Sequence, residues 1–113
     1  MQLDKYTISE YELIEQAIEM IDFNSSRCVV VVNSTKKVLG ILSEGDILRA
    51  ILKGTSVKSP VKNIMNPSFK FLLEKEDKIK MASIFKKGIT LIPVINQQNE
   101  LIEVLNVLDY MNI

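Results

Sequence analysis

Hydrophobic positions along the chain alternate between a helical spacing and continuous apolar runs. In residues 12–23 the apolar side chains recur every three or four positions, which predicts a helix with one buried face. Residues 27–33 are largely β-branched and apolar, which predicts a strand covered on both faces. A short polar turn leads to a returning strand at 38–42. After a polar junction, residues 47–53 predict a second helix, which Gly54 ends.

Two local signals precede this pattern. Ser9, followed three residues later by Glu12, has the spacing of a capping box and predicts the start of the first helix. Short extended segments at 6–8 and 69–73 each lead into a predicted helix.

The same order of elements occurs twice. A shift of 63 residues superposes two strands and the turn between them, from Val31 on Val94 to Asp46 on Asp109. The second copy therefore predicts a helix, two strands and the start of a last helix, at 77–87 (ended by Gly88), 91–96, 101–105 and from Val107 onward. That last helix is shorter than its counterpart in the first copy.

The expected fold class is α+β, with two β-α-β-β-α repeats at residues 1–58 and 59–113. Each repeat is too small to bury its own sheet. The two are therefore expected to pack sheet against sheet about a pseudo-two-fold axis, with helices outside.

Composition excludes several kinds of chemistry. The 113 residues contain 14 basic and 14 acidic side chains, no His and one Cys. A zero net charge argues against nucleic-acid binding, and the lack of His removes the usual general base and zinc ligand. No segment is apolar for long enough to suggest a secretory signal or a membrane span, so a cytoplasmic domain without catalytic or metal site is expected. Cys28, within an apolar strand, is predicted to be buried and inert.

Three motifs carry a resemblance to a known family. They are the junction 40–46 (Gly-Ile-Leu-Ser-Glu-Gly-Asp), Ile-Met-Asn-Pro at 64–67 and Ile-Pro-Val-Ile at 92–95. With the repeated order of elements, the chain resembles a tandem pair of cystathionine-β-synthase (CBS) domains. Residues 45–54 and 59–66 look most like the regulatory CBS pair that precedes certain sugar nucleotidyltransferases. That resemblance implies a catalytic domain beyond residue 113 and no enzymatic activity in this chain.

The junction is the candidate ligand site. Ser43 at a strand end and Asp46 in the first turn of a helix lie where free backbone N–H groups attract phosphate. The resemblance implies that these two residues hold the phosphate and ribose of an adenosine nucleotide. Arg49, three residues after Asp46, lies on the same helix face and could reach a phosphate. The alternatives are that Ser43 and Asp46 only cap the helix and that Arg49 is solvated.

The adenine is expected against the strand that follows the first helix. Val30 is the candidate contact there, with Tyr6 and Thr7 from the segment that leads into the unit.

The second copy departs from the motif. Glu103 replaces Gly40 and Asn106 replaces Ser43, whereas Asp109 is kept as a candidate ligand or cap. A carboxylate near a phosphate is unfavourable. A neutral nucleoside or no ligand is therefore expected at this junction.

These features predict a regulatory module that binds an adenine nucleotide (AMP, ADP or ATP) and needs no cofactor. The resemblance also implies a homodimer through the helical faces, without nucleic-acid or membrane partners. The alternative is a structural dimerisation module whose pockets bind nothing.

Overall fold

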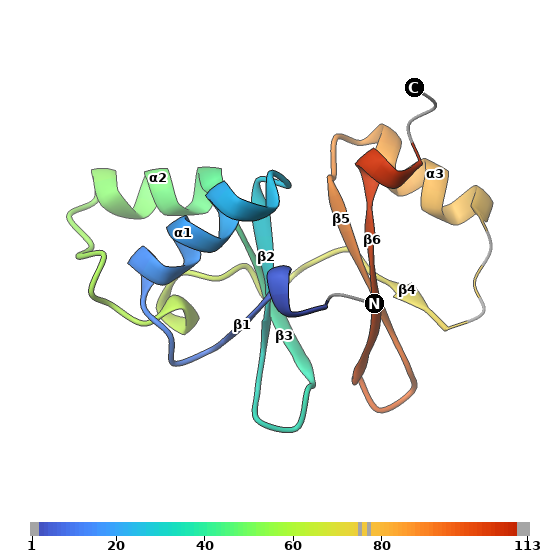
Figure 1. Cartoon of the computed structure of the whole chain (residues 1–113), viewed down its shortest axis with the longest axis horizontal. Helices are drawn as coiled ribbons and strands as arrows, with labels where there is room; N and C mark the ends of the chain where they lie inside the picture. Colours follow the sequence, from blue (N-terminus) through green and yellow to red (C-terminus); the bar gives the residue numbers. More distant parts are fainter. Residues whose placement is uncertain (1–2, 75, 77, 111–113) are drawn as a thin grey trace.

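The chain folds into two three-stranded sheets that lie side by side between helices (Figure 1). The computed structural model describes residues 3–110 except 75 and 77. Its helices and strands are, in order, β1 (Thr7–Ser9), α1 (Ile14–Asn24), β2 (Cys28–Val32), β3 (Val38–Ser43), α2 (Glu44–Leu52), β4 (Leu72–Leu73), α3 (Lys78–Lys86), β5 (Leu91–Ile95) and β6 (Leu101–Asn106). Short 3-10 turns occur at Leu3–Lys5, Val61–Asn63 and Val107–Asp109. No helix in the described part of the chain has the length and apolar character that crossing a bilayer requires.

The two sheets have the same topology. The first has the order β1-β2-β3 and the second β4-β5-β6. In each, the short first strand is parallel to the middle strand, and the middle strand is antiparallel to the third. The register shifts at equivalent places, between Val31 and Val32 and between Val94 and Ile95. The predicted α+β fold with a repeated sheet unit is confirmed.

The middle strands are apolar throughout because both of their faces are covered. In β2, Val29 and Val31 pack with the α1 and α2 side of the first half, whereas Cys28 and Val30 face the second sheet. The second half contributes Leu91, Ile95, Leu101 and Val104 to that shared layer. Helix α3 covers the other face of the second sheet through Met81 and Ile84. The predicted arrangement of sheets inside and helices outside is confirmed.

The two hairpins contact each other through symmetric backbone bonds. Val38 N–H donates to the Asn99 carbonyl at 2.9 Å, and Leu101 N–H donates to the Lys36 carbonyl at 2.9 Å. Lys36 and Asn99, 63 residues apart, both have a left-handed backbone, with φ of 66° and 64°. The pseudo-two-fold axis therefore passes between the two turns.

Helix boundaries differ from the prediction by more than one residue in three places. Helix α1 begins at Ile14, and the carboxamide of Gln16 accepts from the Leu13 N–H at 2.7 Å, so the capping box predicted from Ser9 and Glu12 is wrong. Helix α2 begins at Glu44, three residues earlier than predicted.

The third difference lies in the second half. The predicted last helix is a 3-10 turn at Val107–Asp109, and residues 111–113 lie outside the described part of the chain. The predicted start of α3 at Asp77 also lies outside the described residues.

The connection between the halves is anchored to the first half. Val61 is fully buried in the core beneath α1, and its N–H donates to the Glu12 carbonyl at 2.8 Å. Further along, Asn66 and Ile41 exchange two backbone hydrogen bonds of 2.8 and 3.0 Å. Residues 59–66 thus contact the first half, although the sequence assigns them to the second repeat.

Gly40 makes this crossing of β3 feasible. A Cβ at Gly40 would lie 2.8 Å from the Asn66 carbonyl oxygen and 3.1 Å from the Met65 sulfur. The backbone of the connection therefore occupies the space where a side chain would be.

Replacement of Gly40 by Ala is expected to lower the free energy of unfolding by about 1–3 kcal/mol, the usual cost of overpacking a tight contact. Urea unfolding followed by circular dichroism measures the change. Gly45→Ala is the matched control, because a Cβ there meets only the end of the Arg49 side chain and Ala favours a helix. Equal unfolding midpoints for the two variants would contradict the close approach.

Candidate functional site

The start of α2 is a complete capping box. Ser43 Oγ accepts from the Asp46 N–H at 3.1 Å, and Asp46 Oδ2 accepts from the Ser43 N–H at 3.0 Å. The other Asp46 oxygen accepts from Arg49 Nη2 at 2.9 Å. The Arg49 guanidinium also lies over Gly45, 3.2 Å from where a Cβ would be. The structure thus brings together three predicted site residues, Ser43, Asp46 and Arg49, at one helix end.

A cavity of about 420 Å³ opens beside this helix end, a size in the range of small-molecule sites. The first half contributes Ser43, Glu44 and Gly45 from the junction and Arg27 and Cys28 from the start of β2. The opposite wall comes from the second half and from the connection, through Asn66, Ser68, Phe69, Lys70, Thr90 and Leu91. The cavity is therefore bounded by both halves.

The predicted adenine contacts lie elsewhere. Val30 is fully buried in the layer between the sheets, and Tyr6 packs against that layer. Thr7 pairs with Val30 in the sheet and donates its hydroxyl to the Leu3 carbonyl at 3.1 Å. None of these three residues lines the cavity beside Ser43. Asp46 and Arg49 do not line it either, and they adjoin it through Ser43 and Gly45.

The cavity instead uses the counterpart of the Tyr6 segment in the other half. Ile8 pairs with Val31 and Leu72 pairs with Val94, so the register makes Lys70 the counterpart of Tyr6. Lys70 lines the cavity and Tyr6 does not. A pseudo-two-fold axis sets each junction against the other unit, so the segment that faces Ser43 is the one before β4. Symmetry applied to the repeat could have identified Lys70 and Phe69.

The equivalent junction of the second half is closed by its own side chains. Asn106, at the position of Ser43, is 4% exposed. Its Nδ2 donates to the Tyr6 hydroxyl at 3.0 Å and to Ser26 Oγ at 2.8 Å, and its Oδ1 accepts from the Leu108 N–H at 3.0 Å. Asp109 lies exposed in the 3-10 turn that follows. Sequence reasoning noted the substitution at Asn106 but missed this cross-half role.

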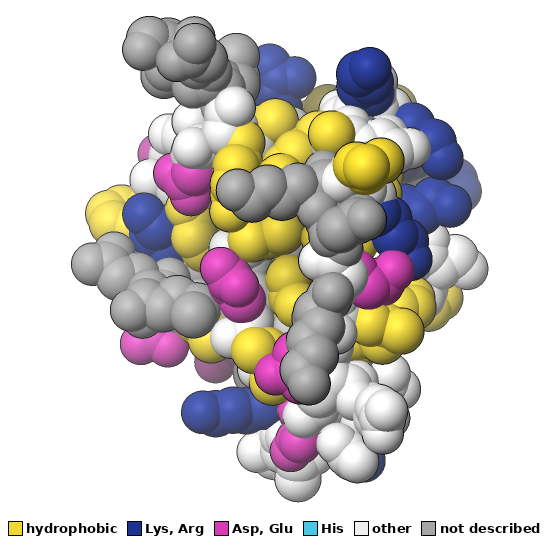
Figure 2. Space-filling model, turned by 90° about the vertical axis from the view of Figure 1, so that its right-hand side faces the viewer, with side chains coloured by type: hydrophobic (Ala, Val, Ile, Leu, Met, Phe, Trp, Pro, Cys, Tyr) yellow, Lys and Arg dark blue, Asp and Glu magenta, His cyan; other side chains and the backbone are white. Residues whose placement is uncertain are grey.

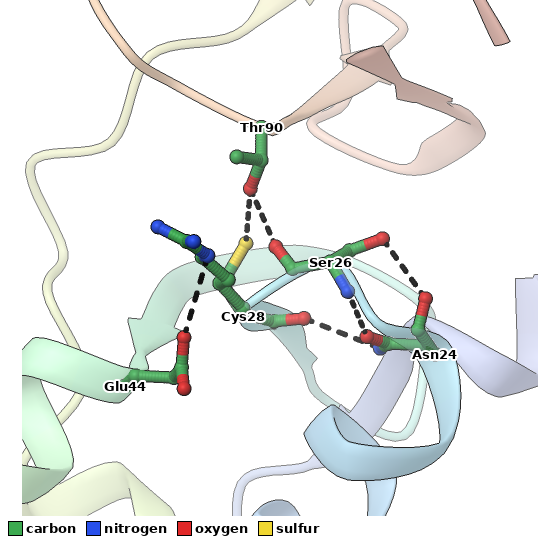
Figure 3. A network of polar contacts seen from close by, with 6 residues as sticks. Asn24, Ser26, Cys28, Glu44 and Thr90 are labelled. Carbon is green, nitrogen blue, oxygen red and sulfur yellow. Dashed lines mark hydrogen bonds and ion pairs between the residues drawn. The ribbon is translucent and has the colours of Figure 1, made fainter. Parts of the chain in front are cut away.

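A polar network ties the halves together at the back of the cavity (Figure 3). Thr90 of the second half donates its hydroxyl to the Ser26 carbonyl at 2.5 Å and lies 3.7 Å from the Cys28 sulfur. Asn24 holds the same loop, because its Oδ1 accepts from the Ser26 N–H and its Nδ2 donates to the Cys28 carbonyl. These contacts fix the start of β2 relative to β5.

The cavity wall carries opposed charges. Arg27 and Lys70 are cationic and Glu44 is anionic. The nearest atoms of Arg27 and Glu44 are 3.8 Å apart, and both side chains are more than half exposed, so the pair is weak. In the described part of the chain, no cluster of three or more His, Cys, Asp and Glu side chains could hold a metal ion. The arrangement suits an anionic ligand held by hydrogen bonds and by cations from both halves.

Comparison with known protein families gives a match for the first half of the chain. The family described as the CBS domain matches residues 1–53. Residues 1–53 therefore resemble a CBS domain. The structure repeats the sheet order of this domain at residues 72–106.

Solved structures share the fold of the whole chain. AcuB of Vibrio cholerae is similar with a TM-score of 0.83 and 21% identity, covering 93% of this chain and 78% of that protein. PAE2072, a CBS domain protein of Pyrobaculum aerophilum solved in complex with AMP, has a TM-score of 0.75 and 22% identity, covering 93% and 82%. Both likenesses show the CBS fold.

A curated relative is much longer than this chain. An uncharacterized protein of Chlamydia muridarum is 25% identical over 91 residues, which is 77% of this chain and 28% of the relative. The chain therefore spans about a quarter of the relative that it matches.

Cys28 is expected to be unreactive in the folded chain. Burial raises the pKa of its thiol from 9.0 to about 11, against a smaller lowering by the Thr90 hydroxyl. Near pH 8 the thiolate fraction is therefore about 100-fold lower than for a free thiol with the ordinary pKa. Labelling by a thiol-specific disulfide reagent should be slow in buffer, faster as pH rises toward 11, and rapid in urea. Labelling in buffer at the rate seen in urea would contradict this burial.

Proposed function

We propose that this chain is a regulatory module that binds an adenosine nucleotide in the cavity beside α2. The observation that carries the proposal is the cavity itself, which places Ser43 and a helix start opposite Lys70 from the other half. The complex of the Pyrobaculum aerophilum CBS protein with AMP supports this ligand class.

Capping and ligand binding are compatible at this junction. The Ser43 hydroxyl accepts within the cap, so its own proton can still be donated to a phosphate oxygen. Each carboxylate oxygen of Asp46 has one recorded partner and a second lone pair that can accept from a ribose hydroxyl. Arg49 shields the carboxylate from one side and can turn toward a phosphate, because its side chain is 66% exposed.

Regulation would follow from the shared cavity. A ligand that contacts both halves stabilises one relative arrangement of them, and it shifts an equilibrium only by its difference in affinity for two states. The attached domain that responds would be a sugar nucleotidyltransferase beyond residue 113, and the chain itself would carry no catalysis. The cellular location of the module would be the cytoplasm, where adenosine nucleotides are made.

The alternative function is a structural dimerisation module. The observation in its favour is that the capping box at Ser43 and Asp46 is satisfied without any ligand. The closure of the second junction by Asn106 also supports a structural module.

Both helical ends of the molecule expose hydrophobic side chains, which supports a homodimer. On α1 and α2 these are Phe23, Leu48, Ile51 and Leu52, and a groove between the two helices is lined by Ile18, Ile47 and Leu48. Hydrophobic side chains are also exposed at the α3 end (Figure 2), where the large exposed ones include Ile79, Leu108 and Tyr110. Exposed apolar area of this extent is typical of an interaction surface.

Calorimetric titration with AMP, ADP and ATP is expected to show one site per chain, and Asp46→Ala to weaken binding at least tenfold, through lost hydrogen bonds to the ribose. Asp46→Asn, which keeps the shape of the cap, separates this effect from unfolding. Asp109→Ala is the matched control at the equivalent position of the second half and should bind like the parent. Absence of binding by a folded dimer would favour the structural module.

Light scattering after size exclusion is expected to give twice the 12.8 kDa chain mass. Leu52→Glu, at a residue that is 86% exposed at the end of α2, should shift the chain toward monomer by charging the apolar face. Tyr11→Glu, at an exposed position outside the helices, serves as the control. A monomeric parent at high concentration would contradict the dimer.

A further inference from the structure

Glu44 is the one acidic side chain that lines the cavity, among the described residues. It is the first residue of α2, and its carboxylate is half exposed. An acidic side chain at this position stabilises the helix through the helix dipole, so its presence alone does not indicate a ligand role. Its position matters because the carboxylate lies beside the helix start at which the phosphate of the proposed ligand would bind.

The first turn of α2 has few free donors. Ser43 N–H donates to Asp46, Asp46 N–H donates to Ser43 Oγ, and Glu44 N–H donates to the Arg27 carbonyl at 2.9 Å. The Gly45 N–H has no partner within the helix, and no hydrogen bond joins it to another described residue. A bound anion can therefore use the Gly45 N–H and the Ser43 hydroxyl, directly beside the Glu44 carboxylate.

The cations of the cavity balance only a small ligand charge. Arg27 and Lys70 together supply two positive charges, and Glu44 removes one of them. Arg49, next to Gly45, is paired with Asp46 and adds a positive charge for the ligand only when it leaves that pair. A single phosphate, with a charge of about −1.5 to −2 at pH 7, already uses all of this positive charge, and each further phosphate adds negative charge near the carboxylate at growing cost.

We propose that Glu44 determines the specificity of the site and selects a nucleoside monophosphate over the diphosphate and triphosphate. The proposal rests on the proposed nucleotide function and names the ligand class within it. The Glu44 carboxylate repels additional phosphates electrostatically. It also pairs with Arg27, so this guanidinium is less available to neutralise them.

The test compares the parent chain with Glu44→Gln, which keeps the size of the side chain and removes its charge. Adenosine, AMP, ADP and ATP are titrated calorimetrically without magnesium, because the metal would mask phosphate charge. The parent is expected to bind AMP more tightly than ATP. In Glu44→Gln the affinity is expected to rise about tenfold for ATP, about two- to threefold for AMP and not at all for adenosine, as for removal of a nearby like charge.

Two controls isolate the charge at the cavity. Glu12→Gln removes the same charge from an exposed side chain that does not line the cavity, and it should leave all four affinities unchanged. Arg27→Gln should weaken every phosphorylated ligand and spare adenosine.

The outcomes separate the two proposals. An unchanged ratio of ATP to AMP affinity in Glu44→Gln, with AMP still bound, overturns the role of Glu44 and leaves the nucleotide function standing. A parent chain that prefers ATP also overturns selection of the monophosphate. A folded chain that binds none of the four ligands overturns the nucleotide function itself.

Discussion

The apolar layer between the two sheets is the interaction on which the rest of the structure depends. Each middle strand is hydrophobic on both faces, and its helices cover one face only. Cys28 and Val30 of one half become buried only by packing against residues of the other half, such as Leu91 and Val104. At roughly 25 cal/mol per Å² of apolar surface, this burial is large compared with the stability of a small domain. Neither half is complete without its partner.

The position of the cavity follows from that packing. Because the sheets meet about a pseudo-two-fold axis, the junction after β3 faces the segment before β4 and the start of β5. The same symmetry sets the junction after β6 against Tyr6 and Ser26. One substitution, Asn106 for the Ser of the motif, provides an amide long enough to reach both of these groups. The two symmetric positions therefore have opposite characters, one open and polar, the other filled by a buried side chain.

Local features of the fold could be predicted from the sequence, whereas contacts between the halves could not. The continuous apolar run at Cys28–Val32 predicts a doubly covered strand because burial demands it. The cap of α1 was predicted wrongly. Several residues near its start can cap a helix, namely Ser9, Glu12 and Gln16, and only tertiary packing selects among them. The adenine contacts were predicted at Val30, Tyr6 and Thr7 because the family resemblance implies that the base lies against the strand after the first helix. Lys70 and Thr90 line the cavity beside Ser43, and no local sequence pattern predicts a contact that arises from the symmetry between the halves.

The two halves are joined by different kinds of hydrogen bond at the two ends of their strands. Two backbone hydrogen bonds join the turns at one end of the strands, whereas at the cavity end the described side-chain ties across the halves come from Thr90 and Asn106. The strands between these ends are five or six residues long, roughly 17–20 Å. The two ends of the strands are therefore joined independently. Replacing Thr90 or Asn106 removes a side-chain tie beside the cavity and leaves the two backbone hydrogen bonds between the turns in place.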